Sequence, residues 1–535
     1  MIVSRCIDFK LEPGPWPRRL DNRTVQDRWE DLAAERFDVL VVGGGVFGCG
    51  VAREAALNGL RVALVERDDL ASGTSSQSSK MIHGGLRYLE NFEFGLVRQA
   101  LRERQVLAEL APHLVRPCPF LVPVYRGAPR GLLKLRLGLW LYDLMAGLPK
   151  RWRRSFPTPA QVTELEPALK TEGLRGTGRF FDWLAYDARL VADVARAARD
   201  AGAVIMTHAE ALGVRGEVGD FTIDVRNPQD ASQSVEVRSR TVVATVGPWC
   251  DAFRAAHDPT AAPRTRLSSG VHVVVPQLLR DHAIVVNARS DGRVLFLLPF
   301  FGRTLIGTTD RDVTGDPHAL TAETRDVDYL LEETNHLLAD RRLDRSDVIQ
   351  AFVGVRTLAR NDDDGEPSRT SREQTIFEEP PGVVHVIGGK LTTWRLIARE
   401  LLERAADRGG LSIDDGTLSR HTPLPGGDET FAMPVDATPD PAVLVRIARE
   451  TNATSLVDLL RRRTPLLLLH RFDTDELRRL ATDVGAALGW SADRIEREVG
   501  DATAEQALPW HGERTSAKRR TSRHRSSSSP NSGTR

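Results

Sequence analysis

The sequence contains few cysteines and no long apolar run. Its 535 residues include four cysteines, Cys6, Cys49, Cys118 and Cys250, which lie far apart and form no CxxC pair. This spacing excludes a disulfide framework and a zinc site, so no metal is expected, and it is typical of a reducing compartment. No run approaches the ~18 apolar residues that a membrane-spanning helix needs, and the first residues lack the basic-then-apolar order of a signal peptide.

An excess of charge of either sign is also lacking. Lys plus Arg equal Asp plus Glu at 73 each, so the overall charge gives no indication of nucleic-acid binding, and none is expected. A content of 41% hydrophobic and 27% charged residues is ordinary for a globular protein. Because the chain is too long for one hydrophobic core, roughly two to four domains are expected.

A dinucleotide-binding pattern begins at Phe37. The aliphatic run Val39–Val42 predicts a buried strand, Val46–Asn58 a helix, and Val62–Val65 a second strand. This alternation is typical of the first βαβ unit of a Rossmann-like domain. Glu66 ends the second strand, where a carboxylate accepts hydrogen bonds from the adenosine ribose hydroxyls and repels the 2′-phosphate of NADP.

Three glycines between this strand and helix have separate steric roles. Gly43 permits a tight turn, Gly45 lets backbone N–H groups approach a pyrophosphate, and Gly48 lets the helix pack closely on the strand. The N-terminus of the helix then faces the diphosphate with the positive end of its dipole. These residues predict a dinucleotide site but do not separate NAD from FAD.

The rest of the chain alternates helical and strand patterns, as an α/β protein does. Helices are expected at 190–201 and 322–340 and, after Pro425, at 441–450, 456–463, 475–488 and 492–498. Strands are expected at 204–206, 221–225, 235–237, 241–246, 271–275, 283–286, 294–298 and 304–308. Residues 1–36 are expected to form a flexible extension, and residues 511–535, basic and rich in serine, a disordered tail.

The stretch from Arg130 to Tyr142, RGLLKLRLGLWLY, has two interpretations. Its leucines and Trp140 are interleaved with Lys134 and Arg136, so it could lie in a membrane interface with the cations at lipid headgroups. It could equally be a core element whose cations extend to solvent from its edge. The sequence alone favours the core element.

Further motifs carry a family resemblance. They are Thr74-Ser-Ser-x-Ser-Ser-Lys80 with Ile82-His-Gly-Gly-Leu-Arg-Tyr-Leu-Glu90, Asp187-Ala-Arg189, Gly247-Pro-Trp249, Gly307-Thr-Thr-Asp310, Gly354-Val-Arg356, Gly388-Gly-Lys-Leu-Thr-Thr393, Pro423-Leu-Pro-Gly-Gly427 and Asp458-x-Leu-x-Arg-Arg-Thr464. With these motifs in this order, the chain resembles the FAD-dependent, respiratory glycerol-3-phosphate dehydrogenases. The resemblance runs from Phe37 into the 460s.

The resemblance implies an α/β fold with a glutathione-reductase-type, Rossmann-like FAD-binding domain, a β-rich substrate domain and a C-terminal helical domain. The expected boundaries are 37–115 with 180–262 and 348–404 for the FAD-binding domain, 116–179 with 263–347 for the substrate domain, and 420–510 for the helical domain.

The implied reaction oxidises sn-glycerol 3-phosphate to dihydroxyacetone phosphate by hydride transfer from C2 to flavin N5, with electrons passed to a membrane quinone. The protein would then be cytoplasmic and peripherally bound to the cytoplasmic face of the membrane, and a homodimer is one alternative for its assembly. Two other functions stay open: an oxidase that gives the electrons to oxygen, and a non-catalytic, flavin-bound interaction protein.

The resemblance also implies roles for individual residues. Arg87 and Arg356 would bind the substrate phosphate, since guanidinium groups pair with phosphate oxygens. His272 would accept the hydroxyl proton, with His83 as its competitor. Hydroxyl contacts would come from Tyr88, Thr308 and Thr309, and Lys390 would add a positive charge near the flavin. The FAD contacts would be Val42, Gly43, Gly44, Gly45, Val46, Phe47, Gly48, Glu66, Arg67, Thr74, Ser75, Ser78, Ser79, Gly247, Asp310, Gly388, Gly389, Lys390, Leu391, Thr392 and Thr393.

Four positions depart from the family pattern. Ser269 stands where relatives often have a lysine, which would remove a cation near the pocket. Ala244, Thr357 and Trp394 replace an asparagine, a proline and a tyrosine that are frequent in relatives. These changes leave room for a shifted substrate or a lower rate.

Overall fold

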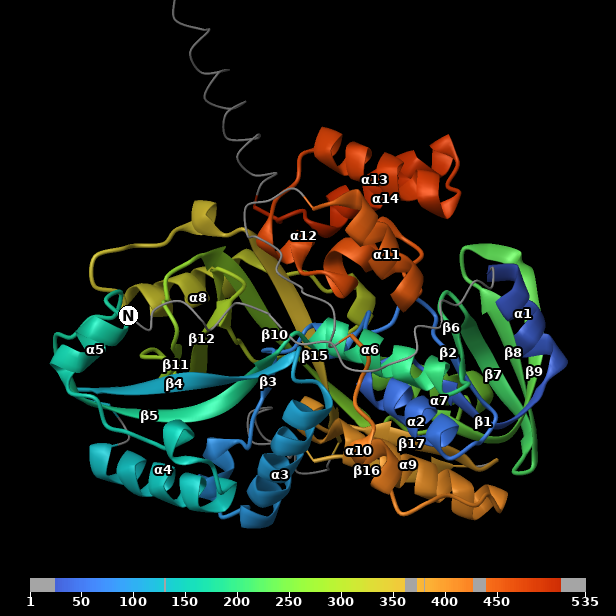
Figure 1. The fold of residues 1–535 in the computed structure, drawn as a ribbon, viewed down its shortest axis with the longest axis horizontal. Helices are drawn as coiled ribbons and strands as arrows, with labels where there is room; N and C mark the ends of the chain where they lie inside the picture. The colour runs from blue at the N-terminus through green and yellow to red at the C-terminus, as the bar shows by residue number, and fades with distance from the viewer. Residues whose placement is uncertain (1–24, 129–130, 361–372, 380, 427–438, 511–535) are drawn as a thin grey trace, which may run out of the picture.

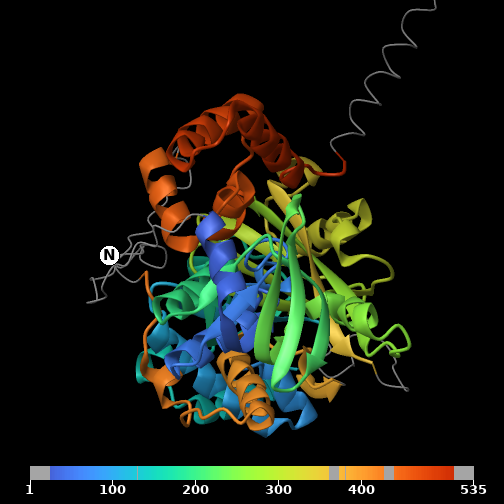
Figure 2. The ribbon, with the colours of Figure 1, turned by 90° about the vertical axis from the view of Figure 1, so that its right-hand side faces the viewer.

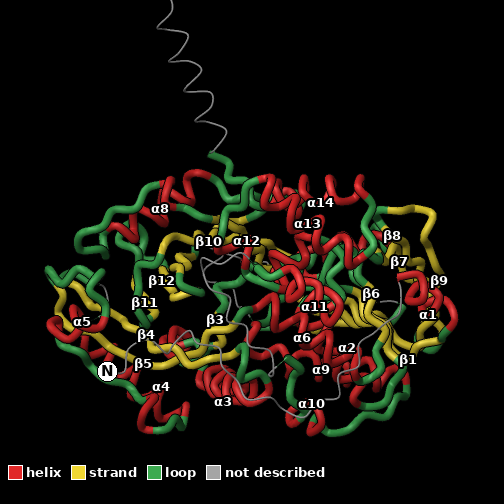
Figure 3. The backbone as a smooth tube through the Cα atoms, turned by 45° about the horizontal axis from the view of Figure 1, so that its top comes forward, coloured by secondary structure: helices red, strands yellow, loops and turns green. Residues whose placement is uncertain are grey.

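The computed structural model describes residues 25–128, 131–360, 373–379, 381–426 and 439–510, apart from the side chains of residues 25–28, 87, 90, 91 and 231. Two large β-sheets lie side by side with helices on their faces, and the C-terminal helices lie along one side of both (Figure 1). Figure 3 shows the same arrangement with the strands in yellow and the helices in red.

The strands are β1 (Arg36–Val42), β2 (Val62–Val65), β3 (Met81–Ile82), β4 (Val115–Tyr125), β5 (Leu174–Ala185), β6 (Val204–Met206), β7 (Glu210–Glu217), β8 (Asp220–Asn227), β9 (Asp230–Ala244), β10 (Thr265–Pro276), β11 (Ala283–Asn287), β12 (Val294–Phe300), β13 (Arg303–Gly307), β14 (Arg311–Asp312), β15 (Gln350–Ala359), β16 (Thr375–Glu379) and β17 (Val383–Ile387).

The α-helices are α1 (Val25–Ala34), α2 (Val46–Leu57), α3 (Phe94–Leu110), α4 (Leu132–Ala146), α5 (Pro159–Leu165), α6 (Asp187–Asp200), α7 (Cys250–His257), α8 (Thr324–Asn335), α9 (Trp394–Gly409), α10 (Thr417–His421), α11 (Pro441–Thr451), α12 (Leu466–Leu469), α13 (Thr474–Leu488) and α14 (Ala492–Glu505). Short 3-10 turns are η1 (Thr74–Ser76), η2 (Leu86–Asn91), η3 (Lys150–Trp152), η4 (Gly247–Trp249), η5 (Pro317–Ala319), η6 (Arg345–Asp347) and η8 (Leu391–Thr393), and η9 (Asp458–Arg463) is a π-helical turn.

The first sheet contains the dinucleotide-binding pattern. Its order is β16-β17-β9-β1-β2-β6, with β8 and β7 continuing from β9. β1 pairs in parallel with β2 and β9, and parallel strands are covered on both faces. Val39 and Val41 therefore pack with α2, α6 and α9 on one face, while Leu40 and Val42 pack with α1 and the β7–β9 ribbon on the other (Figure 2).

The second sheet is mainly antiparallel and forms the wall opposite the dinucleotide-binding sheet. Its order is β14-β10-β13-β12-β11-β4-β5-β3, with β15 also paired to β10. α4 packs against β5, and α8 packs against β10 and β13. β10 carries His272, β13 ends at Gly307 beside it, and β15 carries Arg356, so three neighbouring strands bring the predicted substrate residues together.

The C-terminal helices have a core of their own. Leu444 of α11, Leu459 of η9, Leu477 of α13 and Val499 of α14 belong to one buried cluster. α12 joins this core to the second sheet, because Leu467 belongs to the same cluster and Leu469 lies in a cluster with Phe300. None of the described helices is long and apolar enough to cross a bilayer.

Most predicted elements occur close to their predicted positions, with three differences. The strands expected at 235–237 and 241–246 are one strand, β9, because its first part pairs with β8 and its last part with β1. Residues 25–34 of the expected flexible extension form α1, because Trp29 and Leu32 pack into the core. The helix expected at 456–463 is the π-helical η9. Residues 1–24 and 511–535 lie outside the described residues, and the domain boundaries stay predictions.

The stretch around Trp140 has one face in the core and one face exposed to solvent. It forms α4, whose inner face buries Leu139 and Tyr142. Its outer face exposes Leu133, Leu137, Trp140 and Leu144, with Leu133 at 82% exposure, and Phe92 and Phe94 beside it are also exposed. These six side chains are called the α4 surface below. Arg130 lies outside the described residues.

Candidate active site

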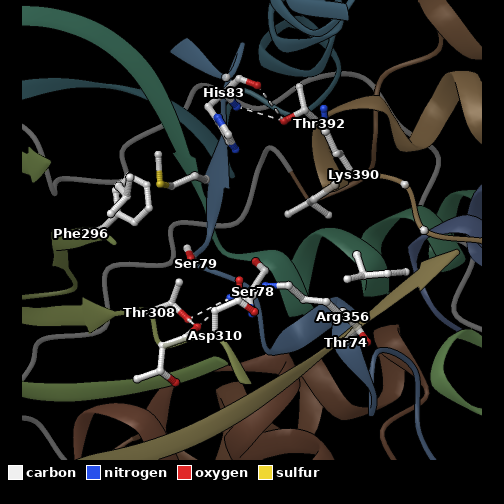
Figure 4. Close-up of a pocket in the computed structure, with 18 of the residues that line it drawn as sticks. Thr74, Ser78, Ser79, His83, Phe296, Thr308, Asp310, Arg356, Lys390 and Thr392 are labelled. Carbon is white, nitrogen blue, oxygen red and sulfur yellow. Dashed lines mark hydrogen bonds and ion pairs between the residues drawn. The ribbon is translucent and has the colours of Figure 1, made fainter. Parts of the chain in front are cut away.

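A large cavity of about 1860 Å³ separates the two sheets. Residues from both sheets line it, including the dinucleotide turn, the loop after η1, and the ends of β13, β15 and β17. Figure 4 shows Ser78, Thr308 and Arg356 among them. Of the predicted FAD contacts, all line this cavity except Gly44, Gly48 and Thr393. The predicted substrate residues Tyr88, Thr308, Thr309, Arg356 and Lys390 line it as well.

The turn between β1 and α2 cannot hold larger residues. A Cβ at Gly43 would lie 2.7 Å from the carbonyl oxygen of Thr245, and the φ of Gly43 is +104°. A Cβ at Gly48 would overlap the carbonyl oxygen of Gly43. These glycines keep the turn compact, so that the N-terminus of α2, which begins after Gly45, faces the cavity.

Glu66 lies beside this turn as the sequence predicts. Its carboxylate accepts hydrogen bonds from the backbone N–H of Gly44, at 2.6 Å, and from that of Asp68, at 2.9 Å. Arg67, the next residue, lies over the ring of Trp249 at 5.1 Å. Trp249 also lines the cavity. It belongs to the Gly247-Pro-Trp249 motif but was not among the predicted contacts.

A second glycine pair lies across the cavity. Gly388 and Gly389 follow β17 with φ of +77° and +90°, and a Cβ at Gly389 would lie 2.6 Å from the ring of Phe47. The helix expected near Lys390 begins as the 3-10 turn η8 and continues as α9. Successive backbone N–H groups of this turn therefore lie at the cavity, where they suit a group that gains negative charge.

The loop that follows η1 is fixed by Asp187 at the start of α6. The Asp187 carboxylate accepts hydrogen bonds from Ser78 Oγ at 2.7 Å and from Lys80 Nζ at 2.6 Å. Lys80 and Asp187 are both buried, and burial lowers the pKa of Lys80 although the aspartate opposes this. Within η1 itself, Ser75 Oγ accepts a hydrogen bond from the backbone N–H of Val46.

Arg356 is held in a fixed orientation at the cavity wall. Its guanidinium donates to Asp310 Oδ1 at 3.2 Å and to Thr308 Oγ1 at 3.0 Å (Figure 4). Gly270 on β10 makes this arrangement possible, because a Cβ there would overlap both Thr308 and Arg356. Ser268, the neighbour on the same face of β10, also lies within hydrogen-bond reach of Arg356.

His83 and Lys390 lie on another side of the cavity, around Thr392 (Figure 4). Thr392 Oγ1 accepts from the backbone N–H of His83 at 3.0 Å and donates to its carbonyl oxygen. Lys390 Nζ lies 3.7 Å from the centre of the Tyr88 ring, a cation–π distance. Phe296 and Met81, which the sequence did not single out, also line the cavity.

His272 lies behind the cavity wall rather than in it. It is 3% exposed, its ring stacks on Phe352 at 5.0 Å, and its Nε2 lies 2.9 Å from Ser79 Oγ. Ser79 lines the cavity, whereas His272 does not. Burial, reinforced by the charges of Arg356 and Lys80, lowers the pKa of His272 to about 3. The imidazole is therefore neutral at physiological pH.

Arg87 and Ser269 are the two remaining positions that the sequence singled out near the substrate. The side chain of Arg87, in η2, is outside what the structure describes. Ser269 and His272 are three residues apart on β10, so their side chains lie on opposite faces of the strand. Ser269 Oγ contacts the carbonyl oxygen of Arg311, on the face opposite Arg356. A serine in place of the expected lysine at position 269 therefore changes the face of β10 that is opposite Arg356.

A family model described as FAD dependent oxidoreductase matches residues 38–404. Glycerol-3-phosphate dehydrogenase 2 of Mycobacterium tuberculosis is 36% identical over 89% of this chain and 89% of its own. The chain belongs to the FAD-dependent glycerol-3-phosphate dehydrogenase family.

Two other similarities agree with this family. D-erythritol 1-phosphate dehydrogenase of Brucella abortus is 38% identical, over 74% of this chain and 80% of its own. The solved structure of the glycerol-3-phosphate dehydrogenase from Bacillus halodurans complexed with FAD has a TM-score of 0.71 and 24% identity, covering 90% of this chain and 96% of that one. The latter similarity confirms the predicted fold.

The residues of this cavity fit the family's cofactor. FAD needs a glycine turn for its pyrophosphate, a carboxylate for its ribose and N–H groups near its flavin. The turn at Gly43, the carboxylate of Glu66 and the glycine pair at Gly388 supply these three features around one cavity.

Glu66 should give FAD binding a defined pH dependence. Burial raises the pKa of its carboxyl to about 6, although the N–H groups of Asp68 and Gly44 oppose this. Only the ionised carboxylate accepts hydrogen bonds from both ribose hydroxyls, so the affinity of the apoprotein for FAD should fall about tenfold from about pH 7 to about pH 5. Flavin fluorescence titration of the apoprotein measures this fall.

The matched variant is Glu66→Gln, which has no ionisation in this range. It should bind FAD more weakly than the wild type near neutral pH, and its affinity should change little as the pH falls. The same pH dependence in both proteins would assign the ionisation to another group. Far-UV circular dichroism at each pH confirms that the proteins stay folded.

Proposed function

We propose that this protein oxidises sn-glycerol 3-phosphate to dihydroxyacetone phosphate and passes the electrons, through FAD, to a quinone in the membrane. One observation carries the proposal. Arg356 and Lys390 line the same cavity as the glycine turn that fits FAD. A phosphorylated alcohol needs fixed cations beside a hydride acceptor, and the name of the M. tuberculosis relative supports glycerol 3-phosphate as that alcohol.

Arg356 is suited to bind the substrate phosphate because it is held in place before the substrate arrives. Asp310 and Thr308 fix its guanidinium plane, so little side-chain entropy is lost on binding. We propose Arg87 as a second phosphate ligand, with Tyr88 and Thr309 as hydroxyl contacts to the substrate. Lys390 adds a positive charge on the η8 side of the cavity.

In the reaction the C2–H and O–H bonds of the alcohol break and a carbonyl forms. FAD, when bound, accepts the hydride from C2. The chain must then take the hydroxyl proton. His83 lines the cavity directly, whereas His272 reaches it only through Ser79. Because the pKa of His272 is lowered to about 3, its imidazole is a weak proton acceptor.

We therefore propose that His83 is the general base that accepts the hydroxyl proton. His272, the base expected from the sequence, would instead orient the Ser79 hydroxyl. Replacing a general base costs about 10²–10⁴ in rate. His83→Gln should lower the rate of anaerobic flavin reduction by that factor, and His272→Gln should lower it by about tenfold or less. Stopped-flow absorbance measures both rates. A larger loss of rate in His272→Gln than in His83→Gln would show that His272 is the general base.

The first experiment on the function is an anaerobic absorbance titration with glycerol 3-phosphate. The flavin band should bleach, and D-erythritol 1-phosphate, suggested by the B. abortus relative, is the comparison substrate. Arg356→Ala should raise the half-saturating concentration about a hundredfold or more, since a charge-assisted contact to phosphate is lost. Arg311→Ala, whose arginine pairs with Asp326 away from the cavity, is the control. A flavin that stays oxidised with both substrates would refute the function.

The α4 surface supports a membrane-bound acceptor. Leu137, Phe92 and Phe94 belong to this surface and also line the cavity, so the apolar patch lies at the cavity mouth. Lys134 and Arg136 are exposed on the same helix, whereas its acid, Asp143, is buried and pairs with Arg154. Exposed leucines and a tryptophan flanked by cations are typical of an interfacial helix. An oxidase would need no such surface, because oxygen diffuses freely.

Trp140→Glu tests the membrane proposal. A charge in place of the indole should release the protein from vesicles of anionic lipid while dye-linked activity stays unchanged, because Trp140 does not line the cavity. Val443→Glu is the control, since Val443 is 38% exposed on α11 among the C-terminal helices, far from α4 (Figure 1). Unchanged sedimentation of the Trp140→Glu protein with vesicles would remove the α4 surface from the proposal.

A further inference from the structure

Three consecutive arginines of the C-terminal helices point into the FAD-binding domain. Arg461, Arg462 and Arg463 end the π-helical turn η9; Arg462 and Arg463 are the arginines of the motif Asp458-x-Leu-x-Arg-Arg-Thr464, and Arg461 precedes them. Arg461 is 2% exposed and Arg463 is fully buried. None of the three lines the cavity, so the site described above gives this motif no role.

Two of these arginines bind one carboxylate. Arg463 donates to both oxygens of Asp69, Nη1 to Oδ2 at 2.8 Å and Nη2 to Oδ1 at 2.5 Å. Arg462 Nε donates to Asp69 Oδ2 at 2.5 Å, and its Nη2 donates to Asp458 Oδ1 at 2.6 Å. Asp69 is 1% exposed. Its charge is therefore balanced by groups that belong to the C-terminal helices.

Asp69 lies in the segment that wraps around the dinucleotide turn. This segment begins at Glu66, whose carboxylate accepts the N–H of Gly44. It returns to the same residue at Ala71, whose N–H donates to the carbonyl oxygen of Gly44. Leu70, between them, would contact a Cβ at Gly44. A shift of Asp69 would therefore move the residues that hold both the turn and the ribose carboxylate.

The third arginine reaches the loop after η1. Arg461 Nη2 donates to Gln77 Oε1 at 3.1 Å, and its Nε donates to Glu505 Oε1 at 3.1 Å. Gln77 lies between Ser75, which accepts the N–H of Val46 at the start of α2, and the serines that line the cavity. The Arg461 guanidinium also lies 5.3 Å from the ring of Phe352, which stacks on His272.

We propose that Arg461, Arg462 and Arg463 form a brace through which the C-terminal helices set the affinity for FAD. The arginines are positioning residues: they hold Asp69 and Gln77, and these residues in turn hold the two segments that flank the glycine turn. The proposal rests on the cofactor of the family and not on the substrate. Its test therefore needs no substrate, and its failure would leave the proposed reaction untouched.

The physical reason lies in the burial of Asp69. Removing one of the two arginines leaves the buried Asp69 carboxylate only partly compensated in a low-dielectric environment, which is unfavourable. The 66–71 segment can relieve this cost by rearranging toward water. That rearrangement disturbs Gly44 and Glu66, and FAD binding must then reverse it, so part of the binding free energy is lost.

The experiment is a fluorescence titration of apoprotein with FAD for Arg463→Gln, Arg462→Gln and Gln77→Ala. Each variant should bind FAD about tenfold or more weakly than the wild type. Arg478→Gln is the matched control, because Arg478 also makes ion pairs, with Asp475 and Glu496, but only within the C-terminal helices. A folded Arg463→Gln protein with an affinity within about twofold of the wild type would overturn the proposal.

A double-mutant cycle separates the brace from general destabilisation. Asp69→Asn alone should weaken FAD binding, and Arg463→Gln added to it should cost much less than it does in the wild type, because the pair is already broken. Fully additive losses would contradict the brace. If Arg463→Gln does not fold, Arg462→Gln and Gln77→Ala test the proposal by the same limits of about tenfold and about twofold on FAD affinity. Both are expected to fold, since Arg462 is partly exposed and Gln77 is uncharged.

Discussion

The buried carboxylate of Asp187 holds together much of what faces the cavity. It starts α6 and binds Ser78 and Lys80 of the loop after η1. Because Lys80 is buried too, neither charge can leave without the other. Through η1 and the loop after it, Ser75 contacts the start of α2, Gln77 contacts the C-terminal helices, and Ser79 contacts His272. The dinucleotide turn, the β10 side of the cavity and the C-terminal helices therefore share one ionic anchor.

The dinucleotide site was predictable from sequence because its requirements are local. Gly43, Gly48 and Glu66 lie within one βαβ unit, where strand, turn and helix fix their positions, and the structure places them as expected. The position of His272 was not predictable in this way. Its motif identifies a strand, but the side-chain environment depends on Ser79 and Phe352, which come from distant segments. The sequence left undecided which side of α4 is exposed for the same reason, since only packing determines which leucines are buried.

Two walls of the cavity differ in how they are built. Arg356 is fixed by neighbours on adjacent strands, and Gly270 provides the space that the guanidinium occupies. His83 and Lys390 instead come from loops that Thr392 joins. In the proposed reaction, the rigid strand wall would hold the phosphate, whereas the loop residues would adjust to the carbon atom that reacts.

The order of strands in the first sheet has a consequence for synthesis on the ribosome. β9 is flanked by β1 on one side and by β17 on the other, and β17 begins only at Val383. The whole second sheet is therefore made before the last parallel strand exists. β8 covers the first part of this side of β9, so only the end of β9 around Val243 and Ala244 waits for β17. At roughly 5–20 residues per second, this wait lasts about ten seconds. The nascent chain thus presents a short unpaired β-edge during translation, the kind of edge to which another strand can add.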